Sequence, residues 1–147
     1  MKTVTVAVAC LIGLTQAAAA QERLAVTAGF GPVNGTRGDG VHGSATVEYQ
    51  TPWRPLQIRV EGIAQKAHFV DILSFGSAQL RPIRGPLLEP YGFLGVGAFF
   101  DNGPQTAAVV GAGADISIRG IPVFIEYKHV NAREGFRLIS IGLRLKK

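Results

Sequence analysis

Cysteine is almost absent from this chain. Cys10 is the only cysteine among 147 residues, and it lies in an N-terminal stretch that we expect to be removed. A mature chain without cysteine can form no disulfide framework, no CxxC site and no thiol nucleophile. Its fold must therefore be held by packing, hydrogen bonds and ion pairs alone.

Long apolar runs are missing as well. The longest, residues 4–14, is shorter than the roughly 18 apolar residues that a membrane-spanning helix needs. Lys2 precedes this run and small residues follow it, which is the layout of a secretory signal peptide. We predict a signal peptide at residues 1–20 and one mature domain at residues 21–147. The alternatives are an N-terminal membrane anchor and a lipoprotein acylated at Cys10, although the residues before Cys10 lack the leucine that is usual in such proteins.

A strong charge of one sign is also lacking. Without Lys2, the mature chain keeps 14 of the 15 basic residues, against 10 acidic ones. The basic residues are scattered and form no clustered stripe, so the sequence does not predict nucleic-acid binding. It also contains no phosphate-binding glycine loop and no dinucleotide-binding motif.

Glycine, by contrast, is abundant, with 19 residues against about 10 expected from average usage. Stretches in which every second residue is apolar alternate with turn signals, as in LQIRVEG at residues 56–62. Residues 69–80 keep no clear phase, which predicts a bulge or a misplaced strand boundary, and the glycine-rich residues 34–43 predict a loop. We predict eight strands, at residues 23–30, 43–50, 56–62, 69–80, 91–100, 108–119, 123–128 and 138–145.

This pattern predicts an all-β fold, an eight-stranded antiparallel up-and-down transmembrane β-barrel, whose tilted strands each need about 9–11 residues. In a water-soluble barrel the apolar face of each strand lines the interior, whereas in a membrane barrel it faces lipid. Here the other faces carry many glycines and single charges of both signs, which suits an interior just wide enough for side chains. Because buried charges need partners, we predict that an interior ionic network plugs the barrel and leaves no open pore. Its predicted members are Glu48, Arg59, Glu61, Asp115, Glu126, Lys128 and Arg144.

The aromatic residues predict two bands at the membrane–water interfaces if the N-terminus is periplasmic. The outer band comprises Phe30, Phe69, Phe99, Phe100, Tyr127 and Phe136. The periplasmic band comprises Tyr49, Trp53, Tyr91 and Phe124. We expect outward loops of roughly 5–12 residues, which are too short for a large binding platform.

Four segments within residues 55–145 carry a resemblance to a known family: EPYGFLGVGAFF, GAGADISI, PVFIEYKHV and LISIGLRL. In order and composition they resemble the C-terminal half of the small outer-membrane β-barrels, such as those of outer membrane protein A and outer membrane protein X. The resemblance implies a monomer in the cell outer membrane with a structural, scaffold or surface-interaction role, no enzyme activity and no cofactor. It implies outer-membrane lipid as a partner, with periplasmic chaperones and the barrel-assembly machinery as partners in transit. One departure is the C-terminal RLKK, because family members usually end in an aromatic residue.

Two alternative functions stay open. Outer-membrane lipid A deacylases are also eight-stranded barrels, with a His-x-Ser-Asn motif and a downstream acid. The segment HVNA offers His129, with Glu134 beyond it, but Asn131 stands where the nucleophilic serine should be and Ser140 lies further along. The second alternative is a soluble periplasmic barrel that binds an apolar ligand. It requires six apolar residues to face inward: Leu24, Val26, Ala28, Ile139, Ile141 and Leu143.

Two short patterns have ordinary explanations. Arg37-Gly38-Asp39 matches an integrin-binding tripeptide, but glycine and aspartate are also common loop residues. His42, His68 and His129 fall near one predicted end of the barrel, yet none is spaced as a local pair of metal ligands. We therefore predict neither a metal site nor adhesion through the tripeptide.

Overall fold

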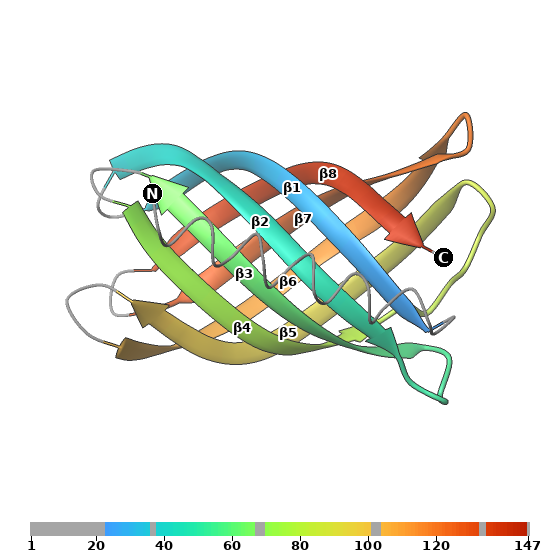
Figure 1. The fold of residues 1–147 in the computed structure, drawn as a ribbon, viewed down its shortest axis with the longest axis horizontal. Coiled ribbons are helices and arrows are strands. Elements are labelled where there is room, and N and C mark those ends of the chain that lie inside the picture. The colour runs from blue at the N-terminus through green and yellow to red at the C-terminus, as the bar shows by residue number, and fades with distance from the viewer. Residues whose placement is uncertain (1–22, 36–37, 67–69, 101–103, 133–134, 147) are drawn as a thin grey trace.

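The computed structural model describes residues 23–35, 38–66, 70–100, 104–132 and 135–146. These residues form eight antiparallel strands that close into one barrel (Figure 1). The strands are β1 (Leu24–Gly35), β2 (Gly38–Gln50), β3 (Leu56–Lys66), β4 (Val70–Leu80), β5 (Leu88–Phe100), β6 (Pro104–Ile118), β7 (Ile121–Asn131) and β8 (Phe136–Lys146). Each strand pairs with the next, and β8 pairs with β1, so the predicted all-β, eight-stranded up-and-down barrel is confirmed.

The described residues contain no helix that is long and apolar enough to cross a bilayer. The predicted signal peptide, residues 1–20, lies outside the described part of the chain.

The two ends of the barrel differ in their connections. At the terminal end, on the right in Figure 1, β1 begins and β8 ends. The strands are joined at this end by residues 51–55, 81–87 and 119–120. At the opposite end, which we call the distal end, they are joined by residues 36–37, 67–69, 101–103 and 132–135. The distal connections are thus two to four residues long, and the prediction of outward loops of roughly 5–12 residues is wrong.

The first distal connection explains this error. Residues 34–43 were expected to form a loop, but β1 continues to Gly35 and β2 starts at Gly38, with Asn34 paired to Asp39. Gly38 has a φ of 109°, a backbone conformation that glycine adopts at little cost. Glycine here permits a short connection, and main-chain pairing continues through residues whose composition is typical of loops.

Of the two explanations for the unclear phase of the fourth strand, a bulge or a misplaced boundary, the bulge is wrong. β4 pairs with β3 without interruption, from Lys66 opposite Val70 to Leu56 opposite Leu80. The inward face of β4 mixes apolar Leu73 with polar Gln79, and both are buried. The alternation of apolar and polar residues in β4 is unclear in the sequence because the barrel interior changes from apolar near the distal end to polar near the terminal end.

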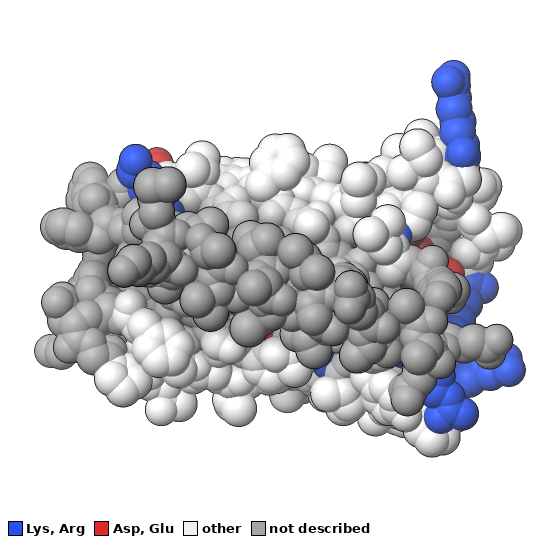
Figure 2. All heavy atoms as spheres, viewed as in Figure 1, with Lys and Arg blue, Asp and Glu red and all other residues white. Residues whose placement is uncertain are grey.

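The outer surface of the barrel is apolar. Ala28, Ile139, Ile141 and Leu143 are exposed on it, and Leu24 and Val26 lie on the same face of the sheet. On the face drawn in Figure 2, most charged side chains of the described residues gather at the two ends of the barrel. The inward orientation required by a soluble barrel with an apolar ligand cavity is therefore wrong.

The two predicted aromatic bands form only in part. Tyr91, Phe99, Phe124 and Phe136 are buried inside the barrel, and Phe69 lies outside the described residues. The members that do face outward are Phe30, Tyr49, Trp53, Phe100 and Tyr127.

Most of the buried rings lie opposite glycines on neighbouring strands. The register places Tyr91 opposite Gly113, Phe93 opposite Gly111, Phe75 opposite Gly97 and Phe124 opposite Gly142. A Cβ atom at Gly113 would lie 2.8 Å from Cζ of Tyr91. The glycines thus make room for inward rings, which is why these aromatics are inside the barrel.

Candidate functional site

The charged interior is the most distinctive candidate site. The alternation of each strand turns all seven predicted network residues inward, and all seven are buried. They divide into two groups of ion pairs, which we call the central cluster and the end cluster.

The central cluster consists of Arg59 and Glu61 on β3 and Glu126 and Lys128 on β7. Arg59 Nη1 donates to Glu126 Oε2 at 2.7 Å, and Arg59 Nη2 donates to Glu61 Oε2 at 3.2 Å. Lys128 Nζ lies 2.8 Å from Glu126 Oε1 and also pairs with Glu61. Two cations therefore face two carboxylates across the interior, and the formal charges of the cluster cancel.

The end cluster lies closer to the terminal end and contains Glu48, Asp115 and Arg144. Arg144 Nε donates to Asp115 Oδ1 at 2.8 Å, and its Nη1 pairs with Glu48. Arg81, which was not predicted, is a fourth member: its Nη1 donates to Asp115 Oδ2 at 2.7 Å and its Nη2 lies 3.8 Å from Glu48. The half-buried Glu89 also accepts a hydrogen bond from Arg81 at 3.3 Å.

A sequence signal for Arg81 existed. Ser77, Gln79 and Arg81 continue one inward-facing alternation, and all three are buried. Arg81 follows directly after β4, and the prolines and the glycine beyond it are typical of a turn, so alternation alone does not assign it to the strand. With it, four bases match the four predicted acids.

Two glutamines connect the clusters. Arg59 Nη1 donates to Gln79 Oε1 at 3.0 Å, and Gln79 Nε2 donates to Gln57 Oε1 at 2.8 Å. Gln57 Oε1 also accepts a hydrogen bond from Arg81 Nε at 2.7 Å. The polar half of the interior is therefore one continuous network, and its members position one another.

Guanidinium groups of the network lie over the faces of buried aromatic rings. The Arg59 guanidinium carbon lies 4.2 Å from the centre of the Phe93 ring, and that of Arg81 lies 4.5 Å from the centre of the Tyr91 ring. Cations over aromatic faces are stabilised, more so away from water. The aromatic rings and the guanidinium groups together fill the part of the barrel interior where the inward-facing glycines have no side chains.

The distal half of the interior is filled mainly by apolar side chains, and the polar His42 and Gln65 are buried in the same half. The rings of Phe99 and Phe136 lie 5.9 Å apart, and the side chains around them are fully or almost fully buried. The other members of this half are Val33, Ile63, Leu73, Phe75, Ala107, Val109, Val130 and Leu138. The barrel therefore has a polar filling near the terminal end and an apolar filling near the distal end.

The geometry does not assemble the deacylase-like site. His129 lies on the outer face of β7, whereas Ser140 is fully buried on the inner face of β8. Ser140 Oγ instead lies 2.8 Å from Nε2 of the buried His42. Asn131 is exposed at the end of β7, and Glu134 lies outside the described residues.

The structure also locates the described residues of the Arg37-Gly38-Asp39 tripeptide and of the histidine set. Gly38 and Asp39 begin β2, so they belong to a strand, while Arg37 lies outside the described residues. His42 is buried and His129 half-buried, and His68 lies outside the described part of the chain. Among the described residues, no three His, Cys, Asp or Glu side chains are grouped so that they could hold a metal ion.

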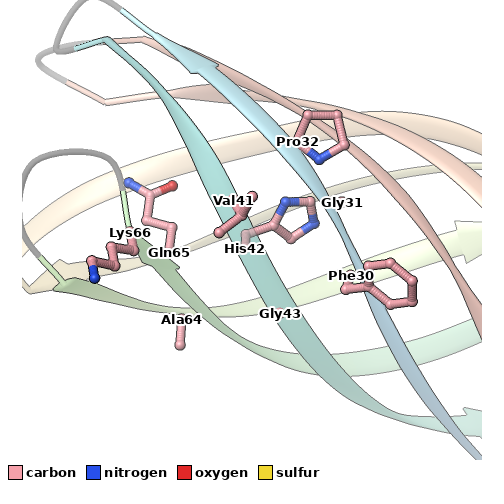
Figure 3. A pocket seen from close by; sticks show the side chains of 9 residues that line it. All are labelled: Phe30, Gly31, Pro32, Val41, His42, Gly43, Ala64, Gln65 and Lys66. Atoms are coloured by element: carbon pink, nitrogen blue, oxygen red, sulfur yellow. The ribbon is translucent and has the colours of Figure 1, made fainter.

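A shallow hollow of about 630 Å³ lies on β1, β2 and β3 toward the distal end (Figure 3). Phe30, Pro32, Val41 and Ala64 lie along it on the outer face, and Lys66 stands at its distal rim. Its lining is almost entirely apolar. The hollow therefore suits hydrocarbon and offers little to a polar ligand.

Comparisons with solved structures identify the architecture. Neisserial surface protein A is similar with a TM-score of 0.63 at 13% identity, covering 84% of this chain and 96% of that one. The N-terminal β-barrel domain of Pseudomonas aeruginosa OprF is similar with a TM-score of 0.62 at 11% identity, covering 84% and 98%. A transmembrane β-barrel designed de novo is similar with a TM-score of 0.61 at 19% identity, covering 84% and 96%.

These similarities concern the fold. No protein-family model matches the chain, and no curated protein matches it in sequence. The predicted resemblance to small eight-stranded outer-membrane barrels is confirmed in architecture.

Proposed function

We propose that this protein is a sealed structural barrel of the outer membrane of a Gram-negative-type cell. It is exported by its N-terminal signal peptide, escorted by periplasmic chaperones and inserted by the barrel-assembly machinery. The observation that carries this proposal is the inverted placement of side chains, with apolar residues outside and paired charges inside.

The outer surface supports a lipid environment. Large apolar side chains are exposed on every strand, among them Ile58, Ile72, Leu94, Val110, Ile125 and Ile141. In water this much exposed apolar area would drive aggregation, whereas in a bilayer it is the favourable arrangement. Closure of the barrel also pairs every strand on both sides, so no free edge remains to recruit a second copy, and the protein acts as a monomer.

The interior supports a scaffold rather than a channel. The central and end clusters fill the terminal half, and the rings of Phe99 and Phe136 close the distal half. The short distal connections provide little area for a surface partner. Of the structural and surface-interaction roles that the fold allows, the structural one fits better, and no enzymatic step is part of this function.

A conductance measurement tests the sealed interior. The barrel, purified from membranes and reconstituted in a planar bilayer, should give no discrete conductance steps, because the buried side chains of the ionic network and of the apolar filling occupy the interior. A water-filled porin inserted in the same bilayer is the positive control. Stable, reproducible single-channel steps from the folded protein would contradict the proposal.

A further inference from the structure

The longest connections of the barrel lie at the terminal end, and two of them are joined into one surface. We call residues 51–55 and 81–87 the terminal platform. The Arg81 main-chain N–H donates to Pro55 O at 2.8 Å, and Arg84 Nη2 donates to Arg54 O at 2.6 Å. Gln50, at the end of β2, donates through Nε2 to Arg54 O at 2.9 Å. These bonds hold the two connections in a fixed arrangement.

The terminal platform presents apolar side chains that contact little of the protein. Trp53 is 61% exposed, Ile83 62% and Leu87 70%. Leu80 and Leu88, at the adjoining strand ends, are exposed as well and continue into the apolar outer surface. An indole ring at the end of an apolar belt is typical of the headgroup region of a bilayer.

The exposed charges around this surface are positive. Arg54 and Arg84 belong to the terminal platform, and Arg23 and Arg119 are exposed at the same end. Lys and Arg side chains gather at this end of the barrel, on the right in Figure 2. Glu89 is half-buried and accepts a hydrogen bond from Arg81. Asp39, an exposed acidic side chain, lies at the opposite end of the barrel.

We propose that the terminal platform docks onto the phosphate-bearing headgroups of the adjacent leaflet and enriches anionic phospholipid around it. Trp53, Ile83 and Leu87 enter the boundary between headgroups and acyl chains, and Arg54 and Arg84 bind lipid phosphates. Arginine suits this role because its planar fork of N–H donors matches phosphate oxygens. This inference rests on the proposed function, because it requires that the barrel span a bilayer.

Trp53 is the only tryptophan in the chain, so its fluorescence reports on the terminal platform alone. The full chain is expressed, and the barrel purified from membranes is reconstituted in vesicles of phosphatidylcholine and phosphatidylglycerol. Either lipid is then replaced by its brominated form at equal mole fraction. Brominated phosphatidylglycerol should quench Trp53 more strongly, with a preference of about fivefold for each arginine that acts near the lipid surface.

Replacing the cations of the terminal platform should lower this preference. Arg54→Gln and Arg84→Gln together should bring quenching by the two brominated lipids much closer to equal, with Arg23 and Arg119 still in place, and Arg54→Glu alone should lower the preference without removing the hydrogen bonds of Arg84. The matched control is Lys66→Gln with Arg137→Gln, which removes two exposed cations at the distal end. This control should keep the wild-type preference.

The outcomes separate this inference from the function on which it rests. A folded barrel whose Trp53 is not quenched by brominated lipid, but is quenched by aqueous iodide, would overturn the docking proposal and leave the barrel function standing. Equal quenching by the two lipids in the wild type would overturn the enrichment of anionic lipid. A protein that forms no heat-resistant β-structure in vesicles would contradict the proposed function itself.

Discussion

Gly113→Leu should prevent the barrel from folding. Gly113 lies on the inner face of β6, directly opposite Tyr91. A Cβ atom there would lie 2.6 Å from the carbonyl oxygen of Ile125 and 2.8 Å from Cζ of Tyr91. The main chain of Ile125 is fixed by its strand pairing, and Tyr91 is held under the guanidinium of Arg81. Neither the Ile125 carbonyl nor the Tyr91 ring can move aside, and a leucine side chain has three further carbon atoms beyond Cβ that would clash with them.

The measurement is refolding into detergent or vesicles, followed by an unheated gel and far-ultraviolet circular dichroism. Gly113→Leu should remain in the slow, unfolded band. The control is Gly76→Leu on β4, where a Cβ atom would meet nothing within 4 Å because the position faces outward. It should fold as well as the wild type. Equal folding of the two variants would mean that Gly113 does not face a filled interior.

Arg59→Met should lower the free energy of unfolding by about 3–5 kcal/mol, the usual effect of removing one partner from a buried ion pair. Arg59 is 2% exposed and contacts Glu126, Glu61 and Gln79. Without it, the two carboxylates of the central cluster share Lys128 alone, and one negative charge remains uncompensated away from water. Methionine keeps most of the volume, so the loss reports on charge more than on packing.

Urea unfolding in vesicles measures this change. Arg137→Met, at an exposed outward position on β8, is the control and should change stability by less than about 1 kcal/mol. Adding Glu126→Gln to Arg59→Met should recover part of the loss, because it removes the uncompensated carboxylate. Equal effects of Arg59→Met and Arg137→Met would contradict a paired interior network.

The strand order and the orientation of the charged residues could be predicted because both depend on local alternation. Glu48, Arg59 and Glu126 each lie in a short stretch in which apolar residues occupy every second position, so their side of the sheet follows from the sequence. Arg81 was missed because it follows the last residue of β4 and precedes Pro82, Gly85 and Pro86, which are residues typical of a turn.

The positions of the aromatic rings could not be predicted in the same way. Tyr91 and Gly113 are 22 residues apart, and only the register of β5 against β6 places them opposite each other. A preference of aromatic residues for membrane interfaces is a statistical rule, whereas the glycines opposite most of the buried rings provide space that is specific to this barrel. The lengths of the distal connections were overestimated for a related reason, since glycines that are typical of loops also permit pairing to continue to the end of a hairpin.

The most direct test of the account is fractionation of cells that express the full chain, combined with a gel of heated and unheated samples. The central claim is that the apolar face of every strand points outward and that the interior is filled and closed. The account predicts recovery in the outer membrane, with a folded band that changes mobility on boiling. Release of the protein into the soluble periplasm, with no change in mobility on boiling, would contradict it.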